Sequence, residues 1–165
     1  MRGVESSIFP KIVGLRYRSR RPALAFALGD MMETEIFSPA KINLTLAITG
    51  KRSDGFHGLT SLVAPVSFGD QVSVRALSGG SSIVLTTNNA SLPVDESNIA
   101  WRAADRFLKR FGIEASIEIR IEKRIPIGAG LGGGSSNGSA VLSGLAKLFD
   151  VDDFEALTSI ATELG

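Results

Sequence analysis

The stretch IPIGAGLGGGSSNGSA at residues 125–140 decides how this chain can be arranged, because five of the seven residues from Gly128 to Gly134 are glycine. Before it, residues 116–122 alternate apolar and polar side chains, which predicts a half-buried strand. After it, apolar residues recur at helical spacing: Ala140, Val141, Leu145 and Leu148. The glycines therefore lie where a strand passes into a helix.

A glycine-rich junction of this kind has a physical use as an anion-binding site. Glycines let backbone N–H groups face a ligand, and a helix start adds unpaired donors and a partial positive charge. Ser135, Ser136 and Asn137 could cap the helix or bond phosphate and ribose oxygens. The alternative, a flexible Gly/Ser linker, is disfavoured by the position between two patterned elements. The Gly-Lys-Ser/Thr of a Walker loop is absent, so the loop alone predicts an anion, with a nucleotide as the favoured one.

Length and composition restrict the class of protein. With 165 residues, 44% hydrophobic and 21% charged, the chain can bury one core, as one domain or a part of one. It has no cysteine, which excludes disulfides and thiolate metal sites, and the single His57 disfavours a zinc site. We therefore predict no metal ligands in the protein itself.

Charge and hydropathy disfavour two kinds of partner, nucleic acid and membrane. Residues 1–30 carry six Lys/Arg and two acids, which leaves twelve against fifteen in the remainder. A mildly acidic body disfavours a nucleic-acid surface as its main purpose. No apolar run approaches the ~20 residues of a membrane span. We expect neither nucleic acid nor membrane as a partner.

The first 31 residues differ from the others, because Arg, Ser and short apolar runs mix there without a sustained period. We expect residues 1–31 to lie outside the fold and residues 32–165 to form the domain. Three interpretations remain open: a transit-type or secretory leader, a disordered basic arm, or a start codon assigned upstream of Met31 or Met32. We favour the last. The expected location is cytoplasmic, or a plastid if the leader is a transit peptide.

The strands before the glycine stretch are predicted from period-two alternation. From Glu35 onward, one face carries Ile42, Leu44, Leu46 and Ile48, and the other carries Lys41, Asn43, Thr45 and Thr49. Residues 71–75 and 82–86, each preceded by turn residues, are predicted to form two short strands of a hairpin.

Three helices complete the prediction. The first begins at Ser97 as N-cap, presents Ala100, Ala103, Ala104 and Phe107 to the core, and ends at Gly112. The second runs from about Ser135 to Phe149, and the third follows Asp152 as its N-cap. Trp101 is expected to pack rather than bind. Because strands and helices do not alternate regularly, the fold class is α+β.

Three segments together resemble one family: SPAKINL at residues 38–44, the DGFH sequence at residues 54–57, and residues 126–137. From about Glu35 to Gly165 the chain resembles the 4-diphosphocytidyl-2-C-methyl-D-erythritol kinases of the GHMP kinase superfamily. The glycine loop is shared across the superfamily, whereas the other two segments are more specific to this branch. The resemblance implies a GHMP kinase N-terminal domain, similar to the second domain of ribosomal protein S5.

The resemblance also implies an activity: ATP, with Mg²⁺, donates its γ-phosphoryl group to the 2-hydroxyl of the cytidyl substrate in non-mevalonate isoprenoid synthesis. Lys41 would lie near the acceptor hydroxyl and Asn43 would orient the substrate. Phe56, where the family more often has Tyr, would stack on cytosine, and His57 would recognise its edge. Asn98, Lys123 and Asn137 would lie nearer the nucleoside. The ATP phosphates would be held by Pro126, Ile127, Gly128, Ala129, Gly130, Leu131, Gly132, Gly133, Gly134, Ser135 and Ser136.

In the family, a segment with an aspartate, the presumed base, follows the helix after the glycine loop. The present sequence ends at Gly165, where that segment is expected to begin, so we expect a fragment without useful turnover. Two other functions stay open: a fragment of another small-molecule GHMP kinase, and a non-catalytic nucleotide-binding or assembly module. The Phe56-His57 pair favours the cytidyl kinase over the first of these.

Overall fold

The structure is a computed structural model that describes residues 31–51 and 57–165. In this part of the chain, four strands form one mixed sheet in the order β1-β2-β4-β3, accompanied by three helices. The predicted α+β class is confirmed. The elements are β1 (Met31–Lys51), β2 (His57–Ser78), β3 (Ile83–Thr87), α1 (Ile99–Phe111), β4 (Ala115–Glu122), α2 (Gly133–Leu148) and α3 (Phe154–Leu164).

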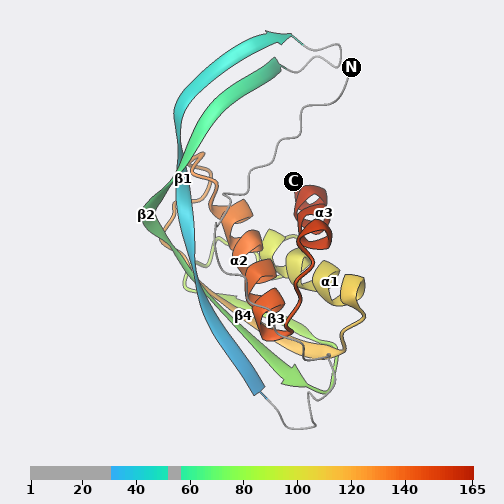
Figure 1. The fold of residues 1–165 in the computed structure, drawn as a ribbon. Helices are drawn as coiled ribbons and strands as arrows, with labels where there is room; N and C mark the ends of the chain where they lie inside the picture. Colours follow the sequence, from blue (N-terminus) through green and yellow to red (C-terminus); the bar gives the residue numbers. More distant parts are fainter. Residues whose placement is uncertain (1–30, 52–56) are drawn as a thin grey trace.

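The helices cover one face of the sheet, and the paired outer parts of β1 and β2 extend beyond the helix layer (Figure 1). α1 and α2 contact both the sheet and each other, and α3 packs on them. The β1–β2 pairing is antiparallel and contains irregularities between Pro39 and Lys41, Asn43 and Thr45, and Ile48 and Gly50. These bulges interrupt the strict alternation that the sequence predicts. In this structure Ile42, Leu44, Leu46 and Ile48 are all exposed.

The core follows the period-two pattern of the two central strands. Ile117, Ile119 and Ile121 of β4 are buried while the residues between them face outward, which confirms the predicted strand. Across the antiparallel pairing, the buried Val72, Val74 and Ala76 of β2 lie opposite these isoleucines. Phe107, Val141 and Leu145 close this core from the helix side.

The predicted hairpin of residues 71–75 and 82–86 is wrong. Residues 71–75 belong to the long β2, which pairs with β1 and with β4. Residues 83–87 form β3, which pairs in parallel with β4 instead. The turn predicted at residues 67–70 is also wrong, because these residues lie within β2, whereas the chain does turn at Gly79 and Gly80. Alternation predicts the buried face of a strand but does not identify its neighbour.

Two helix caps are shifted by one residue from their predicted positions. Asn98, not Ser97, caps α1: its Oδ1 accepts the Ala100 N–H at 2.9 Å. Asp153, not Asp152, caps α3 by accepting the Ala156 N–H. The predicted end of α1 is confirmed, since Gly112 has φ 61° there.

Replacing Asn98 with Ala should lower the free energy of unfolding by about 0.5–2 kcal/mol, because the first turn of α1 loses its side-chain acceptor. Urea unfolding measures this loss. The matched control is Ser97→Ala, whose hydroxyl bonds Asp95 and not the helix; we expect it to stay within about 0.5 kcal/mol. Equal losses in the two variants would contradict the assignment of the cap.

Candidate functional site

The glycine stretch forms the connection between β4 and α2, as the sequence predicts. Gly128, Gly130 and Gly132 have φ values of 74°, 72° and 71°, which an L side chain rarely adopts. At Gly132 there is a second constraint, because a Cβ atom would lie 2.9 Å from Cγ of Lys41. The backbone of the loop therefore approaches the Lys41 side chain at a distance that only glycine allows.

The start of α2 is not capped by a side chain. Its N-cap is Gly132, and no side-chain hydrogen bond closes the first turn. The first N–H groups of an α-helix have no partner within the helix. Together with the helix dipole, they make this end of α2 suitable for an anion. Ser135 is exposed at the same end.

Strand β1 supports the loop from one side. The Ser38 hydroxyl donates to Ser136 Oγ at 2.9 Å and accepts from the Asn137 amide at 2.9 Å. Further along β1, the Lys41 N–H donates to the Leu131 carbonyl at 2.9 Å. The segment from Ser38 to Lys41 thus fastens to the loop and to the first turn of α2.

Lys41 and Asn43 lie on the same side of β1, as predicted. The Lys41 ammonium donates to Asn43 Oδ1 at 3.1 Å, and the stem of Lys41 lies against Gly132. A cation and an amide are therefore placed next to the uncapped start of α2. This juxtaposition provides a charge that can approach a bound anion.

A buried carboxylate, Asp70, joins the elements around the loop. Its Oδ1 accepts the N–H groups of Arg124 and Ile125 at 2.7 and 2.8 Å. Its Oδ2 accepts the Lys123 ammonium at 2.6 Å and the Asn137 amide at 2.9 Å. The Asp70 side chain has no exposed surface, and that of Lys123 is only 4% exposed. All four donors point to one charged group.

The environment of Asp70 favours its ionised form. Burial by itself raises the pKa of this carboxyl, but the hydrogen bonds from Lys123, the two backbone N–H groups and Asn137 outweigh burial and lower the pKa below its ordinary value of 3.8. Asp70 is therefore a carboxylate at neutral pH. It balances the charge of Lys123, so this lysine adds no net positive charge to the loop.

Comparison with known proteins identifies the fold of this chain. The model of the family "GHMP kinases N terminal domain" matches residues 98–165. A crystal structure of 4-(cytidine 5'-diphospho)-2C-methyl-D-erythritol kinase is 37% identical with a TM-score of 0.69, covering 80% of this chain and 46% of that one. The chain has the fold of a GHMP kinase N-terminal domain. The predicted fold family is confirmed.

Two curated relatives confirm the resemblance of this GHMP kinase N-terminal domain to the 4-diphosphocytidyl-2-C-methyl-D-erythritol kinases. The enzyme of Methylacidiphilum infernorum (isolate V4) is 45% identical over 130 residues, which are 78% of this chain and 45% of that protein. The chloroplastic enzyme of Oryza sativa subsp. japonica is 47% identical over 48% of this chain and 20% of that protein. The chain spans less than half the length of these relatives.

The side chains predicted near the nucleoside point into the GHMP kinase N-terminal domain. Asn137 is 2% exposed, with its amide bonded to Ser38 and Asp70. Lys123 is paired with Asp70, and the Asn98 amide donates to the Pro93 carbonyl while its oxygen caps α1. In this structure, the side-chain nitrogens of these three residues all donate to groups of the protein itself.

The two residues predicted to bind cytosine lie at the edge of what is described. Phe56 is outside the described residues. His57 begins β2, where its backbone pairs with that of Lys51. Their roles stay predictions.

The sequence interpretation missed Asp70 as part of this site, because residues 67–70, which belong to β2, were interpreted as a turn before the strand. A signal was present: Asp70 is in phase with Val72 and Val74, whose side chains form the buried face of β2. Period two places this carboxylate on an apolar face. A carboxylate on a buried face needs hydrogen bonds or an opposite charge, so this position predicts a buried partner for Asp70.

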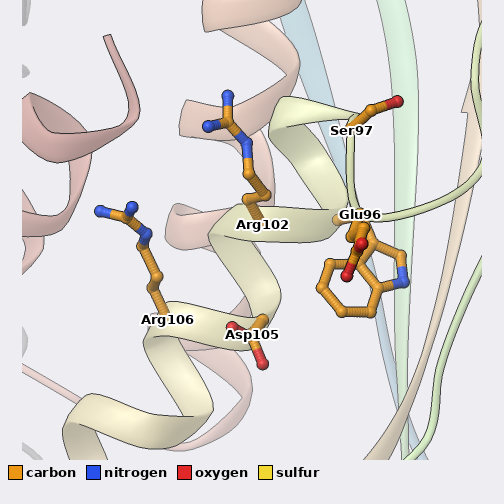
Figure 2. A pocket seen from close by; sticks show the side chains of 6 residues that line it. Glu96, Ser97, Arg102, Asp105 and Arg106 are labelled. Atoms are coloured by element: carbon orange, nitrogen blue, oxygen red, sulfur yellow. The ribbon is translucent and has the colours of Figure 1, made fainter.

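A separate open hollow beside α1 does not form a convergent site. It is lined by Glu96, Ser97, Trp101, Arg102, Asp105 and Arg106. Figure 2 shows Arg102 and Arg106 directed away from Glu96 and Ser97. Arg106 pairs with Glu163, and Trp101 donates its indole N–H to the Ile83 carbonyl. The prediction that Trp101 packs is therefore consistent with its contacts.

Residues 31–51 and 57–165 contain no group of three or more His, Cys, Asp or Glu arranged to hold a metal ion. No helix in these ranges has the length and apolar character needed to cross a membrane.

Proposed function

We propose that the chain supplies the nucleotide-binding part of a 4-diphosphocytidyl-2-C-methyl-D-erythritol kinase, an enzyme of non-mevalonate isoprenoid (terpenoid) synthesis. The reaction is ATP-dependent phosphorylation of the substrate's 2-hydroxyl. The observation that carries the proposal is the uncapped, glycine-rich start of α2 beside Lys41. The names of the similar proteins supply the substrate class.

ATP would contribute the phosphoryl group, and the loop of this chain would hold its phosphates. Backbone N–H groups from Gly128 to Ser135 and the positive end of α2 suit a polyanion, whereas the Ser136 N–H donates to the Gly132 carbonyl. Phosphoryl transfer depends mainly on positioning and electrostatic stabilisation, which fixed backbone donors supply. Mg²⁺ would accompany the ATP phosphates, because proteins usually bind this ion together with substrate phosphates.

On the acceptor side, Lys41 would approach the substrate hydroxyl and neutralise the charge that develops there. Its hydrogen bond to Asn43 supports this role, because the amide restrains the ammonium without burying it. Asn43 would orient the substrate. Phe56 would stack on the cytosine, and His57 would bond its edge. Asn98, Lys123 and Asn137 would influence the nucleotide by shaping the protein beneath it.

The alternatives are another small-molecule GHMP kinase and a non-catalytic nucleotide-binding module. Binding of ATP and of the cytidyl substrate to the protein, each measured by calorimetry, separates them. The cytidyl kinase requires both. ATP alone favours another kinase or the binding module, and binding of neither contradicts all three. We propose small molecules as the partners, and a cytoplasmic location, with a plastid as the alternative in view of the chloroplastic relative.

Replacing Gly133 with Val should weaken ATP binding at least tenfold. A Cβ atom at this position would lie 2.9 Å from Lys123 Nζ and 3.0 Å from Ile125 Cγ2, so a branched side chain must displace the loop or its support. Titration with a fluorescent ATP analogue measures the effect. Ser143→Val, on the exposed surface of the same helix, controls for helix propensity. Equal affinities of the two variants for the ATP analogue would contradict the assignment of the loop to the phosphate site.

A further inference from the structure

The carboxylate of Asp70 has no role in the reaction proposed above, although it is the most completely bonded acid in the described part of the chain. It lies at the point on β2 where the sheet meets the loop, and its side chain has no exposed surface. A ligand outside the protein therefore cannot touch it. Any influence on a nucleotide must pass through the groups that Asp70 holds.

These groups belong to the two ends of the glycine loop. Oδ1 binds the N–H groups of Arg124 and Ile125, which immediately precede the loop. Oδ2 binds the amide of Asn137, in the first turns of α2, which immediately follows it. Between these anchors lie the residues from Pro126 to Gly132, three of which are glycines without a side chain to restrict their conformation.

We propose that Asp70 is a positioning residue for nucleotide binding, because its two oxygens fasten the beginning and the end of the glycine loop to one point. This inference rests on the proposed function. The clamp sets the separation of the loop's ends, and hence the direction of the backbone N–H groups that would meet the phosphates. Ser38 reinforces the same end of α2 through Asn137 and Ser136.

The chemistry of the clamp requires a carboxylate and not merely a polar side chain. Four donors converge on Asp70, and an ionised carboxylate consists only of acceptors. An asparagine at this position has the same shape but one NH₂ group, which would face either two backbone N–H groups or an ammonium and an amide. The ammonium of Lys123 is the stronger donor, so the asparagine oxygen would face it and the NH₂ group would face the N–H groups of Arg124 and Ile125. The beginning of the loop must then be released.

The same carboxylate also keeps Lys123 away from the phosphates. A Cβ atom on Gly133 would lie 2.9 Å from Lys123 Nζ, so this ammonium lies directly beneath the start of α2. Asp70 holds it there at 2.6 Å, on the buried side of the helix. Lys123 thus supports the loop from below as part of the clamp.

The test compares Asp70→Asn with the wild-type 165-residue chain in two measurements. Hydrogen exchange without nucleotide follows the amides of Arg124 and Ile125, which should exchange at least tenfold faster in the variant. Titration with a fluorescent ATP analogue should show affinity at least tenfold weaker. The matched control is Asp105→Asn, since Asp105 pairs with Lys109 on α1 away from the loop; both measurements should stay unchanged.

A second variant separates the clamp from a general loss of structure. Asn137→Leu removes the bond to the α2 end but leaves the bonds of Asp70 to Arg124 and Ile125. It should weaken the ATP analogue while the exchange of those two amides stays slow. Retention of wild-type affinity by this variant would overturn the requirement for both anchors.

The outcomes distinguish the inference from the proposed function. Unchanged exchange in Asp70→Asn overturns the clamp itself. Faster exchange with unchanged affinity overturns the positioning role and leaves nucleotide binding intact. If the wild-type chain does not bind the analogue, the proposed function fails and the nucleotide role of Asp70 fails with it, while the exchange result still decides whether Asp70 fastens the loop.

Discussion

Replacing Lys123 with Met should lower the free energy of unfolding by about 3–5 kcal/mol, the cost of breaking a buried ion pair on one side only. Methionine preserves most of the lysine stem, so packing changes little, but the Asp70 carboxylate loses its cation at 2.6 Å while it stays buried. Three hydrogen bonds, from Arg124, Ile125 and Asn137, cannot replace the missing charge. Guanidinium unfolding at pH 7 measures the loss.

The matched control is Lys109→Met. Lys109 pairs with Asp105 at 2.8 Å, but its side chain is 75% exposed and the pair is of the helical i,i+4 type. Such pairs contribute about 0.2–0.5 kcal/mol. Similar losses in the two variants would show that burial does not strengthen the Asp70 pair.

The pH dependence gives a second and independent check of the Lys123 variant. In the wild type the pKa of Asp70 is lowered in the folded state, so its contribution to stability is present above the ordinary value of 3.8 and is lost as the pH falls below it. Without Lys123, fewer hydrogen bonds lower the pKa of Asp70, while burial still raises it, so we expect this pKa to rise. As the pH falls, Asp70 is therefore protonated at a higher pH in the variant than in the wild type, and protonation removes its unpaired buried charge. The stability gap between them should narrow as the pH falls, and a gap that widens would contradict the charge assignment.

Replacing Phe107 with Ala should also cost about 3–5 kcal/mol, because a large buried ring is exchanged for a cavity. Phe107 is fully buried, and its ring centroid lies 4.8 Å from that of Phe111 and 6.2 Å from that of Phe149. It thereby joins α1 to the end of α2, the helix that carries the glycine loop. Urea unfolding, with the midpoint and slope both fitted, measures the effect.

Phe154→Ala is the control for the Phe107 variant, since Phe154 begins α3 with 69% of its surface exposed. We expect a change within about 0.5 kcal/mol. A small loss for Phe107→Ala, comparable to that of the control, would mean that the helices do not depend on this contact for their position over the sheet.

Much of the fold could be predicted from the sequence because the local signals are strong. Alternation in residues 116–122 predicted the strand β4 and its buried face, and the glycine at position 112 predicted the end of α1. The concentration of glycine after β4 gave the loop and the helix that follows. Each of these features is encoded within a few residues by side-chain period or by a required backbone angle. The caps at Asn98 and Asp153 were missed by one residue, since neighbouring polar residues compete for the same position.

Partners across the sheet could not be predicted in this way. The strand of residues 83–87 was assigned to a hairpin, yet it pairs in parallel with β4 after the chain has crossed through α1 and returned. Period two is the same for every such pairing, so it determines the inward face and leaves the neighbour open. The bulges in β1 similarly depend on its partner strand.

Residue patterns alone predict the glycine loop, its place between a strand and a helix, and the side of β1 that carries Lys41 and Asn43. The contacts that hold the loop depend on tertiary packing: Asp70 reaches Ile125 across 55 residues and Asn137 across 67, and Ser38 reaches Ser136 across 98. Local sequence patterns relate only residues that are close together in the chain, so they cannot identify partners at these separations. Burial required each of these polar groups to find a partner, and packing of the sheet against α2 determined which one.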